Sequence, residues 1–445
     1  MLARSKNPSQ KSMPFDLTLY TDLLWSYGQC LKNKAQVKKT SFHFYHESNL
    51  HKLTEALQKR TYRPWKSQIF VVKNPKPREV IAAHMRDRVV HHLLYRYMSP
   101  FWERLFVPNS YASREGKGPL QAVADLRSFM RHYHRHRGPL YYLKVDVQSF
   151  FASIDLNVLQ AIVEKHLSND FYLWLFKVTL WHRATDPGNY ELRSPMSDLQ
   201  LIPRYKSLFH VPRDKGLPIG NLTSQFCANI YLNELDQFIS HHLTQTGVVY
   251  WQRYVDDLVL LSPRKDVLVN AAEAMQQFLR SKLYLSLNPL KTSIQPVSAG
   301  IDHLGYFIKP DHMLVRRRVV DNFKRTCLQQ LMSKSENPNE LMASANSFLG
   351  YFCHADSYGL RRAAVSKILS HPNASPRLSA GQDFKKLTLS NDPDAGSSVA
   401  EKERQLRKQF EVEFVNQSVD GANCQRYMKN WRPMADFGWP GDGPP

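Results

Sequence analysis

The chain has few cysteines, far fewer acidic than basic residues, and no long apolar run. Its five cysteines are scattered and include no Cys-x-x-Cys pair, which argues against a zinc site and against a disulfide framework. Because no run of about 18 apolar residues occurs, we expect no membrane-spanning helix. The first residues also lack the apolar core of a signal peptide. We therefore expect a protein of a reducing cytoplasm with no membrane partner.

Positive charge is what the chain has in excess. Lys and Arg number 60 against 39 Asp and Glu, which gives a net charge of +21. A surplus of this size predicts a polyanionic partner, because cationic side chains that neutralise phosphates release bound counterions. Nucleic acid is the first candidate, and a membrane surface is the alternative. With 445 residues and 42% hydrophobic content, the chain can bury a substantial core in two or three subdomains.

Two adjacent aspartates, Asp256 and Asp257, lie inside an apolar, β-prone run that extends from residue 248 to residue 261. Such a run predicts a β-hairpin with the acidic pair at its tip. Burying unpaired carboxylates is costly. A divalent cation would remove that cost, because carboxylate oxygens are natural ligands of Mg²⁺. For an isolated acidic pair, a solvated turn is the alternative interpretation.

A third carboxylate, Asp146, ends another strand-like run at residues 140–145, and Asp155 follows in the next segment. Two strands that each end in aspartate could bring three carboxylates onto one pair of Mg²⁺ ions. In phosphoryl transfer, one metal activates the attacking hydroxyl and the other holds the leaving group. The pattern therefore predicts nucleotidyl transfer, if the rest of the chain binds a nucleic acid and a triphosphate. For Asp155, a helix N-cap is the simpler interpretation.

Several motifs occur in the order in which reverse transcriptases carry them, and the chain resembles that family over residues 40–370. Residues 144–151 (KVDVQSFF) resemble the first metal motif of the family. Residues 216–225 (GLPIGNLTSQ) resemble its template and nucleotide-positioning motif, and residues 254–257 (YVDD) resemble the YxDD box. Each motif alone is a weak signal, whereas the ordered set is specific.

Four further segments extend the resemblance. Residues 287–292 (LNPLKT) resemble the motif whose lysine approaches the leaving phosphates, and residues 303–306 (HLGY) resemble the primer grip. Upstream, residues 76–80 (KPREV) and 110–118 (SYASREGKG) resemble the fingers of bacterial reverse transcriptases.

The resemblance implies a metal site and a catalytic set. Asp146, Asp256 and Asp257 would be catalytic and would ligate two Mg²⁺ ions together with the carbonyl of Val147, with Mn²⁺ as the alternative ion. Asp146 and Asp256 are the first ligands in this scheme, and Asp257 is the weaker one. Lys291 would protonate or neutralise the departing pyrophosphate.

A nucleotide-binding set is implied as well. Phe151, five residues after Asp146, would stack under the sugar and exclude a 2′-hydroxyl, because a packed pocket cannot take one more atom cheaply. A ring of the core is the alternative, and Phe150 is the other candidate for the gate. Arg78 offers a planar donor suited to phosphate, although surface charge on a hairpin is the alternative. The remaining implied residues are Lys76, Gly220 and Gln225 for the nucleotide, and His303, Leu304, Gly305 and Tyr306 for the primer grip.

The fold implied by the resemblance is α+β: a right-hand polymerase with fingers, palm and helical thumb, plus a C-terminal extension. The N-terminal region and fingers are expected at residues 1–139 and the palm at 140–310, with an insertion at about 183–213 packed on the palm. The thumb is expected at 311–370, and a linker with an accessory segment at 371–445, where the composition shifts to Pro, Ser, Asn, Asp and Gly.

Local patterns predict three helices. Residues 158–180 read as one helix, and residues 401–415 read as another, charged helix. The basic, aromatic stretch 131–138 follows a predicted helix at 120–132 and could contact phosphates or form a solvated loop.

The implied function is RNA-directed DNA polymerisation, in which dNTPs are added against an RNA template to give a DNA product. Pairs Ile219-Gly220 and Ser224-Gln225 replace the Gln-Gly and Ser-Pro pairs of most retron and group II intron enzymes. This variant resembles diversity-generating retroelement reverse transcriptases and unclassified, defence-associated bacterial ones. We therefore expect a cytoplasmic bacterial enzyme of antiphage defence that copies a structured noncoding RNA, with a protein partner or RNA at the C-terminal segment.

Three alternatives remain open. The chain could be a diversity-generating retroelement enzyme, an RNA-directed RNA polymerase, or a catalytically inactive RNA-binding scaffold. Phe151 and the YVDD sequence argue against the second alternative. The presence of Asp146, Asp256, Asp257 and Lys291 argues against the third.

Overall fold

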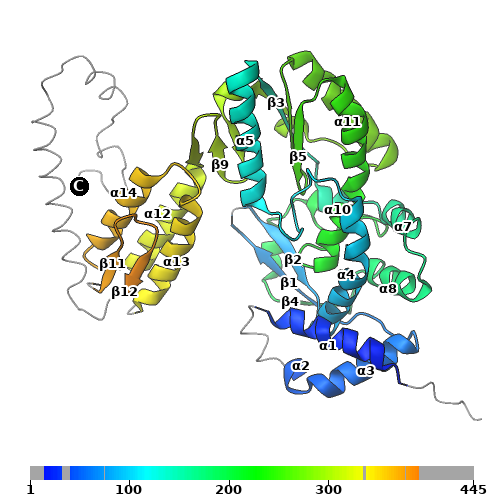
Figure 1. Ribbon diagram of the computed structural model, residues 1–445. Helices are drawn as coiled ribbons and strands as arrows, with labels where there is room; N and C mark the ends of the chain where they lie inside the picture. Colours follow the sequence, from blue (N-terminus) through cyan, green and yellow to red (C-terminus); the bar gives the residue numbers. More distant parts are fainter. Residues whose placement is uncertain (1–14, 33–40, 75, 334–336, 376, 390–445) are drawn as a thin grey trace, which may run out of the picture. The chain divides into compact units, whose positions relative to one another are not determined.

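A four-stranded antiparallel sheet carries the three predicted metal ligands in the computed structural model (Figure 1). Its strand order is β5-β6-β3-β7. The predicted hairpin is confirmed, since β5 pairs antiparallel with β6 across a short turn. Leu143 and Val145 of β3, and Leu258 and Leu260 of β6, are buried in the main hydrophobic core. The strands are β3 (Tyr141–Asp146), β5 (Tyr250–Tyr254), β6 (Asp257–Ser262) and β7 (Ser293–Pro296).

The chain divides into two units, and the sheet belongs to the first. The first unit comprises residues 1–129 and 136–296, and the second comprises 130–135 and 297–445. Both contain helices and strands, which is consistent with the predicted α+β class. The residues that the structure describes are 15–32, 41–74, 76–333, 337–375 and 377–389.

Helices supply most of the core of the first unit. Helix α10 (Leu222–Phe238) is buried along most of its length, and its buried residues include the polar Ser224, Asn229, Asn233 and Asp236. It packs on α4 (Met85–Leu105), which also contacts α1 (Leu17–Leu31). No helix in the described part of the chain is long and apolar enough to cross a membrane. The other α-helices of this unit are α2 (Ser41–Phe44), α3 (His46–Gln58), α5 (Pro119–Arg137, of which residues 130–135 are assigned to the second unit), α6 (Phe150–Ser153), α7 (Leu156–Glu164), α8 (Asp170–Leu180), α9 (Met196–Leu199) and α11 (Lys265–Lys282).

A second sheet of the first unit has the order β2-β1-β4. Strand β1 (Ser67–Val72) pairs antiparallel with β2 (Arg78–Ala82) and parallel with β4 (Tyr190–Leu192). Residues 183–213, predicted as an insertion packed on the palm, thus contribute a strand to the same sheet as the β1–β2 hairpin. They can do so because one edge of β1 is left free by β2.

The loop after β4 is held by two charged side chains that the sequence did not single out, the partly buried Arg183 and the buried Glu79. The Arg183 guanidinium donates to four backbone carbonyls of this loop, those of residues 208, 211, 212 and 215. The Glu79 carboxylate of β2 accepts from Ser207 Oγ at 2.7 Å and from the Leu208 amide at 2.5 Å. These bonds make the loop an integral part of the fold.

The second unit has its own core. Helices α12 (Arg317–Met332), α13 (Pro338–Phe352) and α14 (Tyr358–Leu369) bury Phe323, Leu349 and Ile368 against one another. The structure also forms a hairpin inside the range predicted as linker, because Leu378 and Leu387 are buried in this core. The predicted helix at 401–415 lies outside the described residues. The strands are β8 (Ile301–His303), β9 (Tyr306–Ile308), β10 (Met313–Val315), β11 (Leu378–Ala380) and β12 (Leu387–Leu389).

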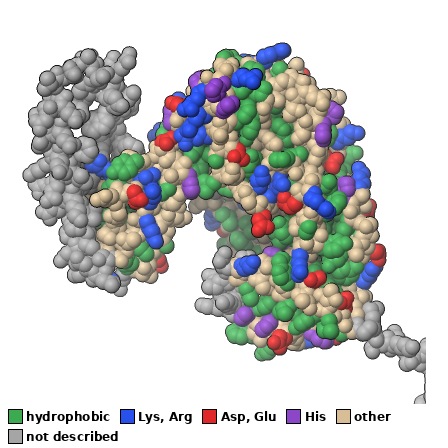
Figure 2. Space-filling model, viewed as in Figure 1, with side chains coloured by type: hydrophobic (Ala, Val, Ile, Leu, Met, Phe, Trp, Pro, Cys, Tyr) green, Lys and Arg blue, Asp and Glu red, His purple; other side chains and the backbone are tan. Residues whose placement is uncertain are grey.

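Two local predictions differ from the structure. The helix predicted at 158–180 is interrupted, because α7 ends at Glu164 and a new N-cap at Asn169 accepts from the Tyr172 amide and starts α8. The basic stretch at 131–138 is helical and not a loop, since α5 continues to Arg137. Figure 2 shows Lys, Arg and His side chains grouped over α5. The predicted capping role of Asp155 is confirmed by its bonds to the amides of Asn157 and Val158, both in α7.

Candidate active site

The sheet brings the three predicted aspartates together. Asp146 ends β3 and Asp257 begins β6, and the antiparallel register places the two residues directly opposite each other. Asp256 lies in the turn before β6, and its carbonyl accepts from the Val147 amide at 3.3 Å. Residues paired across antiparallel strands point to the same face, where like charges repel. The site therefore concentrates negative charge that Lys144, the one basic residue of the two paired strands, offsets only in part.

The pKa values reflect this concentration. Burial, together with the nearby Asp257 and Asp146 carboxyls, raises the pKa of Asp256 to about 7. Burial also raises the pKa of Asp257, and the nearby ammonium of Lys144 opposes this rise. Both shifts mean that the ionised form of each group is disfavoured in the protein. An added cation at this site would favour the ionised forms.

Lys291 is the cation that now contacts Asp146. Its Nζ lies 2.7 Å from Asp146 Oδ1, and its side chain is 51% exposed. The preceding turn is fixed to the same aspartate, because the Asn288 amide donates to the Asp146 carbonyl at 2.7 Å. The Asn288 side chain in turn caps the Leu290 amide. Lys291 thus reaches the carboxylate of Asp146, and its half-exposed side chain could also turn towards a phosphate.

The donor set suits a hard cation, although the site is not preassembled. Among the described residues, no group of three or more His, Cys, Asp or Glu side chains is arranged to hold a metal ion. Instead, one Asp146 oxygen is engaged by the ammonium of Lys291. Carboxylate and carbonyl oxygens are nevertheless what Mg²⁺ and Mn²⁺ prefer, and the raised pKa of Asp256 marks a deficit of positive charge. A divalent ion would take the place that Lys291 occupies.

The turn that carries Asp256 has an unusual backbone. Tyr254 pairs with Asp257, so Val255 and Asp256 form a two-residue turn. Val255 has φ +57°. A positive φ is rare for a β-branched residue and costs free energy, which the surrounding structure must supply. The Val255 carbonyl accepts from Arg253 Nη1 at 2.9 Å.

Arg253 and Asp236 form a buried ion pair below this turn, which sequence reasoning missed. Both side chains are fully buried, and Nη2 of Arg253 lies 2.6 Å from Oδ2 of Asp236. Burial raises the pKa of Asp236, while the charge of Arg253 lowers it. The available signal was an arginine, Arg253, inside the β-prone run that predicts the hairpin.

The phenylalanine pair separates into a core ring and a partly exposed ring. Phe150 is 2% exposed and belongs to the main core, whereas Phe151 is only partly buried against that core. The Phe151 carbonyl accepts from the Leu217 amide at 2.7 Å, so it is tied to the predicted nucleotide-positioning motif. Of the two rings, Phe151 is therefore the one that could contact a ligand.

Gly220 lies against β2. A Cβ atom there would be 2.9 Å from Val80 Cγ1 and 3.1 Å from the Ile81 carbonyl, and Gly220 has φ +122°. Next to it, the Ile81 amide donates to the Ile219 carbonyl at 2.8 Å. In this structure the glycine permits close approach to the β2 backbone. Packing against β2 therefore explains why glycine occupies this position, which was predicted to face the nucleotide.

The other predicted nucleotide residues are exposed. Gln225, in the first turn of α10, accepts from Ser113 Oγ at 3.3 Å. Lys76 and Arg78 are exposed on the β1–β2 hairpin, where both could reach a charged ligand.

The predicted primer-grip residues form a tight hairpin in the second unit. His303 pairs with Tyr306, and both Leu304 and Gly305 in the turn have positive φ, as a two-residue hairpin turn requires. The Tyr351 hydroxyl donates to the Leu304 carbonyl at 2.7 Å and fixes the turn. Tyr306 and Tyr351 stack at 4.5 Å between ring centroids.

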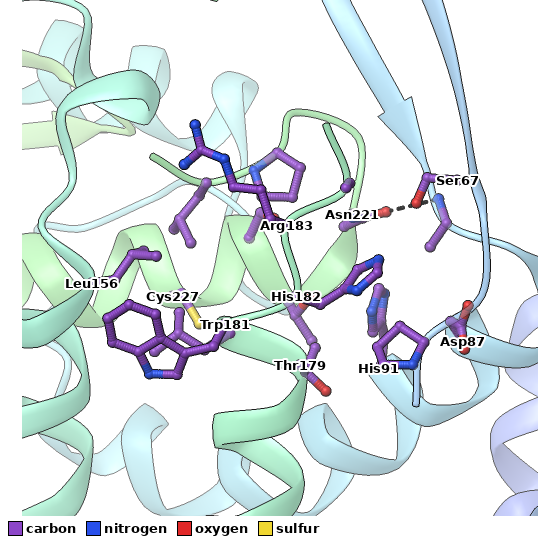
Figure 3. Close-up of a pocket in the computed structure, with 18 of the residues that line it drawn as sticks. Ser67, Asp87, His91, Leu156, Thr179, Trp181, His182, Arg183, Asn221 and Cys227 are labelled. Carbon is purple, nitrogen blue, oxygen red and sulfur yellow. Dashed lines mark hydrogen bonds between the residues drawn. The ribbon is translucent and has the colours of Figure 1, made fainter. Parts of the chain in front are cut away.

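A separate cavity lies behind the nucleotide-positioning motif (Figure 3). Its volume is about 70 Å³, and it is lined by His91, His182 and Asn221 among others. Burial lowers the pKa of His91 to about 3, so this histidine is neutral near pH 7. The Asn221 side chain accepts from the Ala83 amide at 3.2 Å, which fixes the start of α10 to the end of β2. None of the predicted metal-binding or nucleotide-binding residues lines this cavity.

Comparison with known proteins gives a family for most of the first unit. A family model described as reverse transcriptase (RNA-dependent DNA polymerase) matches residues 66–308, more than half of the chain. The matched range begins at β1, ends at β9, and contains the three aspartates and Lys291. A curated relative is the nuclear intron maturase 1, mitochondrial, of Arabidopsis thaliana, which is 28% identical over 95 residues. That match covers 21% of this chain and only 12% of the relative.

Proposed function

Because the chain belongs to the reverse transcriptase (RNA-dependent DNA polymerase) family, we propose that it copies an RNA template into DNA by adding dNTPs to a primer. Enzymes of this kind are nucleotidyltransferases, in which the primer 3′-hydroxyl attacks the α-phosphate and pyrophosphate leaves. The observation that carries the proposal is the direct opposition of Asp146 and Asp257 across β3 and β6, with Asp256 in the adjoining turn. Two facing carboxylates are unfavourable unless a cation lies between them.

The residues present suit two divalent metal ions, Mg²⁺ or alternatively Mn²⁺. Asp146 and Asp256 would be the first ligands, with Asp257 and the Val147 carbonyl in support. Bound metal ions of this class activate a hydroxyl and neutralise a leaving phosphate. For the chain's own residues, this implies that Lys291 gives up Asp146 when the ions bind. Its ammonium is then available to the departing pyrophosphate.

The remaining residues would position the substrates. Phe151 would lie under the sugar and exclude a 2′-hydroxyl, a role supported by its partial exposure and by the burial of its neighbour Phe150. Arg78 and Lys76 would bind the triphosphate from the β1–β2 hairpin. For Gly220 the packing against β2 supports an indirect role, in which it fixes the segment that leads to Gln225. Residues 303–306 would contact the primer.

The experiment is primer extension by the purified full-length chain. With a poly(rA) template, an oligo(dT) primer and Mg²⁺, we expect dTTP incorporation that chelation of the metal abolishes. The matched control is the Asp256→Asn variant, which keeps the size of the side chain and removes its charge. If wild-type protein extends the primer no better than this variant does, the polymerase assignment is wrong and an RNA-binding scaffold becomes the better account.

Ribonucleotide addition would distinguish an RNA-directed DNA polymerase from an RNA-directed RNA polymerase. The same assay with UTP in place of dTTP tests for an RNA-directed RNA polymerase. We expect a strong preference for dTTP, because the partly exposed Phe151 ring would meet the additional hydroxyl. Equal use of both nucleotides would favour the RNA polymerase.

For the biological role we propose a dedicated, structured noncoding RNA template in a bacterial antiphage defence system. The sequence variant at Ile219-Gly220 and Ser224-Gln225 supports this context, with sequence diversification as the alternative. We place the protein in a bacterial cytoplasm, in keeping with the free cysteines of the described residues. The C-terminal segment would bind the RNA or a protein partner.

A truncation tests the role of that segment. The cut belongs after Leu389, because removal of all residues from 371 onward would also delete Leu378 and Leu387 from the core of the second unit. Deletion of residues 390–445 should impair copying of the RNA that copurifies with the protein, yet spare extension of a primed homopolymer. Full activity on the native RNA would show that the segment serves another purpose.

A further inference from the structure

The guanidinium of Arg253 uses all five of its N–H donors inside the protein. Nε and Nη2 donate to the two oxygens of Asp236 at 2.7 and 2.6 Å. Nη2 also donates to Ser110 Oγ at 2.9 Å, and Nη1 donates to Asn229 Oδ1 at 3.2 Å. The remaining Nη1 donor goes to the carbonyl of Val255 at 2.9 Å. Since arginine has five donors, no donor is left over.

Stability alone gives a poor reason for such an arrangement. A buried ion pair must recover the cost of removing two charges from water, and apolar residues of similar volume are often at least as stabilising. What apolar residues cannot do is hold a carbonyl at a fixed point. Here the carbonyl that is held belongs to Val255, whose backbone is in the strained left-handed region.

The same arginine ties the turn to two other elements. Asp236 and Asn229 lie on α10, and the Asn229 amide group also donates to the Ala112 carbonyl at 2.7 Å. The backbone of Arg253 is bonded on both sides to the segment before α5: its amide donates to the Asn109 carbonyl at 2.9 Å, and its carbonyl accepts from the Tyr111 amide at 3.0 Å. The turn, α10 and this segment are therefore all bonded to one residue, Arg253.

We propose that Arg253 and Asp236 are positioning residues that hold the Val255–Asp256 turn in its left-handed form and so keep Asp256 where it can bind a divalent cation. The inference rests on the proposed function in one respect, namely that the carboxylates take such a cation. Neither residue reaches the carboxylates itself. Their action is exerted through the Val255 carbonyl, one peptide bond from Asp256.

Two variants test the proposal with readouts other than activity. Arg253→Lys keeps the charge but offers three donors at one point, so it cannot serve Asp236 and the Val255 carbonyl together. Asp236→Asn keeps the shape and removes the charge that orients Arg253. For each full-length variant, Mn²⁺ affinity is measured from the signal of the free ion in electron paramagnetic resonance. Amide hydrogen exchange of residues 250–262 is measured in parallel without metal.

We expect both variants to bind Mn²⁺ about tenfold or more weakly, the usual effect of losing a residue that orients a metal ligand, and to exchange faster in the turn. The matched control is Asp87→Asn, which removes a buried carboxylate that accepts from the Tyr62 hydroxyl and the Trp65 amide. This control should lose stability but keep the Mn²⁺ affinity and the slow exchange of the turn. If Asp87→Asn weakens Mn²⁺ binding as much as Arg253→Lys does, the network acts only through overall stability and the proposal is overturned.

A second substitution asks whether the left-handed backbone is what the network holds. Glycine is favoured at this position of a two-residue hairpin turn with positive φ. Val255→Gly should therefore restore part of the Mn²⁺ affinity lost in Arg253→Lys, and it should restore none in Asp256→Asn. Absence of any restoration in the Arg253→Lys background would overturn the role assigned to the backbone.

Failure of the proposed function would look different. If wild-type protein binds no Mn²⁺ at all, the assignment of a metal site is refuted. The expected effect of Arg253 and Asp236 on metal affinity is then refuted as well. Hydrogen exchange then still decides the positioning claim. Unchanged exchange of residues 250–262 in Arg253→Lys would overturn it.

Discussion

Two groups of charged side chains lie at the end of β5, and the protein treats them in opposite ways. Arg253 and Asp236 are fully buried, each charge is matched by the other, and Arg253 makes further hydrogen bonds to Asn229, Ser110 and the Val255 carbonyl. Asp146, Asp256 and Asp257 are crowded at the end of the sheet, where the only cationic side chain bonded to Asp146 among the described residues is that of Lys291, half-exposed. The first group is balanced within the fold, whereas the second is left with an excess of negative charge.

The difference separates structural charge from functional charge. A balanced buried pair fixes geometry, because each partner would leave an uncompensated charge if the other moved. In the second group, burial and the neighbouring carboxyls together raise the pKa of Asp256, and its ionised form therefore lowers the stability of the protein. Perturbed carboxylates of this kind are typical of functional sites. Removing one charge from each group should therefore have opposite effects.

The largest effect is expected on catalysis. Asp146→Asn or Asp256→Asn should reduce dNTP incorporation by several orders of magnitude, because each removes a metal ligand's charge without changing its size. Primer extension at saturating dNTP measures the loss, and circular dichroism checks that the fold is intact. Near-normal incorporation by either variant would remove the cluster from the active site.

Stability should change with opposite sign in the two groups. Asp236→Asn is expected to destabilise the protein by about 3–5 kcal/mol, because it leaves Arg253 buried and unpaired. Asp256→Asn is expected to stabilise the metal-free protein by about 1–2 kcal/mol at pH 8, a figure reduced for the partial exposure of Asp256. Denaturant unfolding of both variants beside wild type measures the contrast. Destabilisation of similar size in both variants would end the distinction between the groups.

The pH dependence sharpens that contrast. The pKa of Asp256 is raised to about 7 from a usual value of 3.8, so the folded protein holds this proton more firmly than the unfolded chain does. The associated stability is fully present below pH 3.8 and is lost as the pH rises to about 7. The advantage of Asp256→Asn should therefore grow between about pH 4 and pH 7 and stay constant above. An advantage independent of pH would mean that the carboxyl group is not the cause.

A smaller effect is expected at the sugar. Phe151→Ala should increase ribonucleotide incorporation relative to deoxyribonucleotide incorporation by about tenfold or more, because the ring that excludes the additional hydroxyl is removed. Competition between the two nucleotide classes measures the ratio. Phe150→Ala is the comparison, and it should destabilise the core without a selective gain in ribonucleotide use. If Phe151→Ala leaves the selectivity unchanged, another residue is the gate.

The smallest effect concerns the general surplus of positive charge. If about five phosphates are neutralised, the slope of log K for a single-stranded RNA against log salt should be about −3.5. Neither Asp256→Asn nor Asp236→Asn should alter that slope. The slope depends on how many phosphates are neutralised by Lys and Arg side chains, and neither substitution removes such a side chain. A flat salt response would mean that the surplus of +21 charges serves a different partner.

The sequence was sufficient for features that depend on local pattern. The apolar run before Asp146 predicted a strand that ends in this aspartate, and the run around Asp256 predicted the β5–β6 hairpin, although β5 ends at Tyr254 and Asp257 begins β6. The capping role of Asp155 followed from its place before a helix. Features that depend on partners far apart in the chain were missed. Nothing local to Arg253 indicates that its partners would be Asp236, Asn229 and Ser110, which are brought together only by α10 and the segment before α5.

The same limit explains the other differences. Residues 183–213 looked like an insertion because their pairing with β1 spans more than a hundred residues of sequence. The hairpin at residues 378–389 looked like linker because the composition of the surrounding segment is polar, and only isolated apolar residues such as Leu378 and Leu387 are buried in the core. The left-handed backbone of Val255 could not be predicted, since valine is among the residues least expected there.

The most direct test of the difference between the two charge groups is the change in thermal stability on adding Mg²⁺. If Asp146, Asp256 and Asp257 lack a cation, wild-type protein should gain about 2.7 kcal/mol at a Mg²⁺ concentration one hundred times the dissociation constant, with a corresponding rise in Tm. Asp256→Asn should gain little or nothing, because it already lacks the charge that the cation would balance. An equal rise in Tm for wild type and Asp256→Asn would contradict this account, since Mg²⁺ would then bind elsewhere.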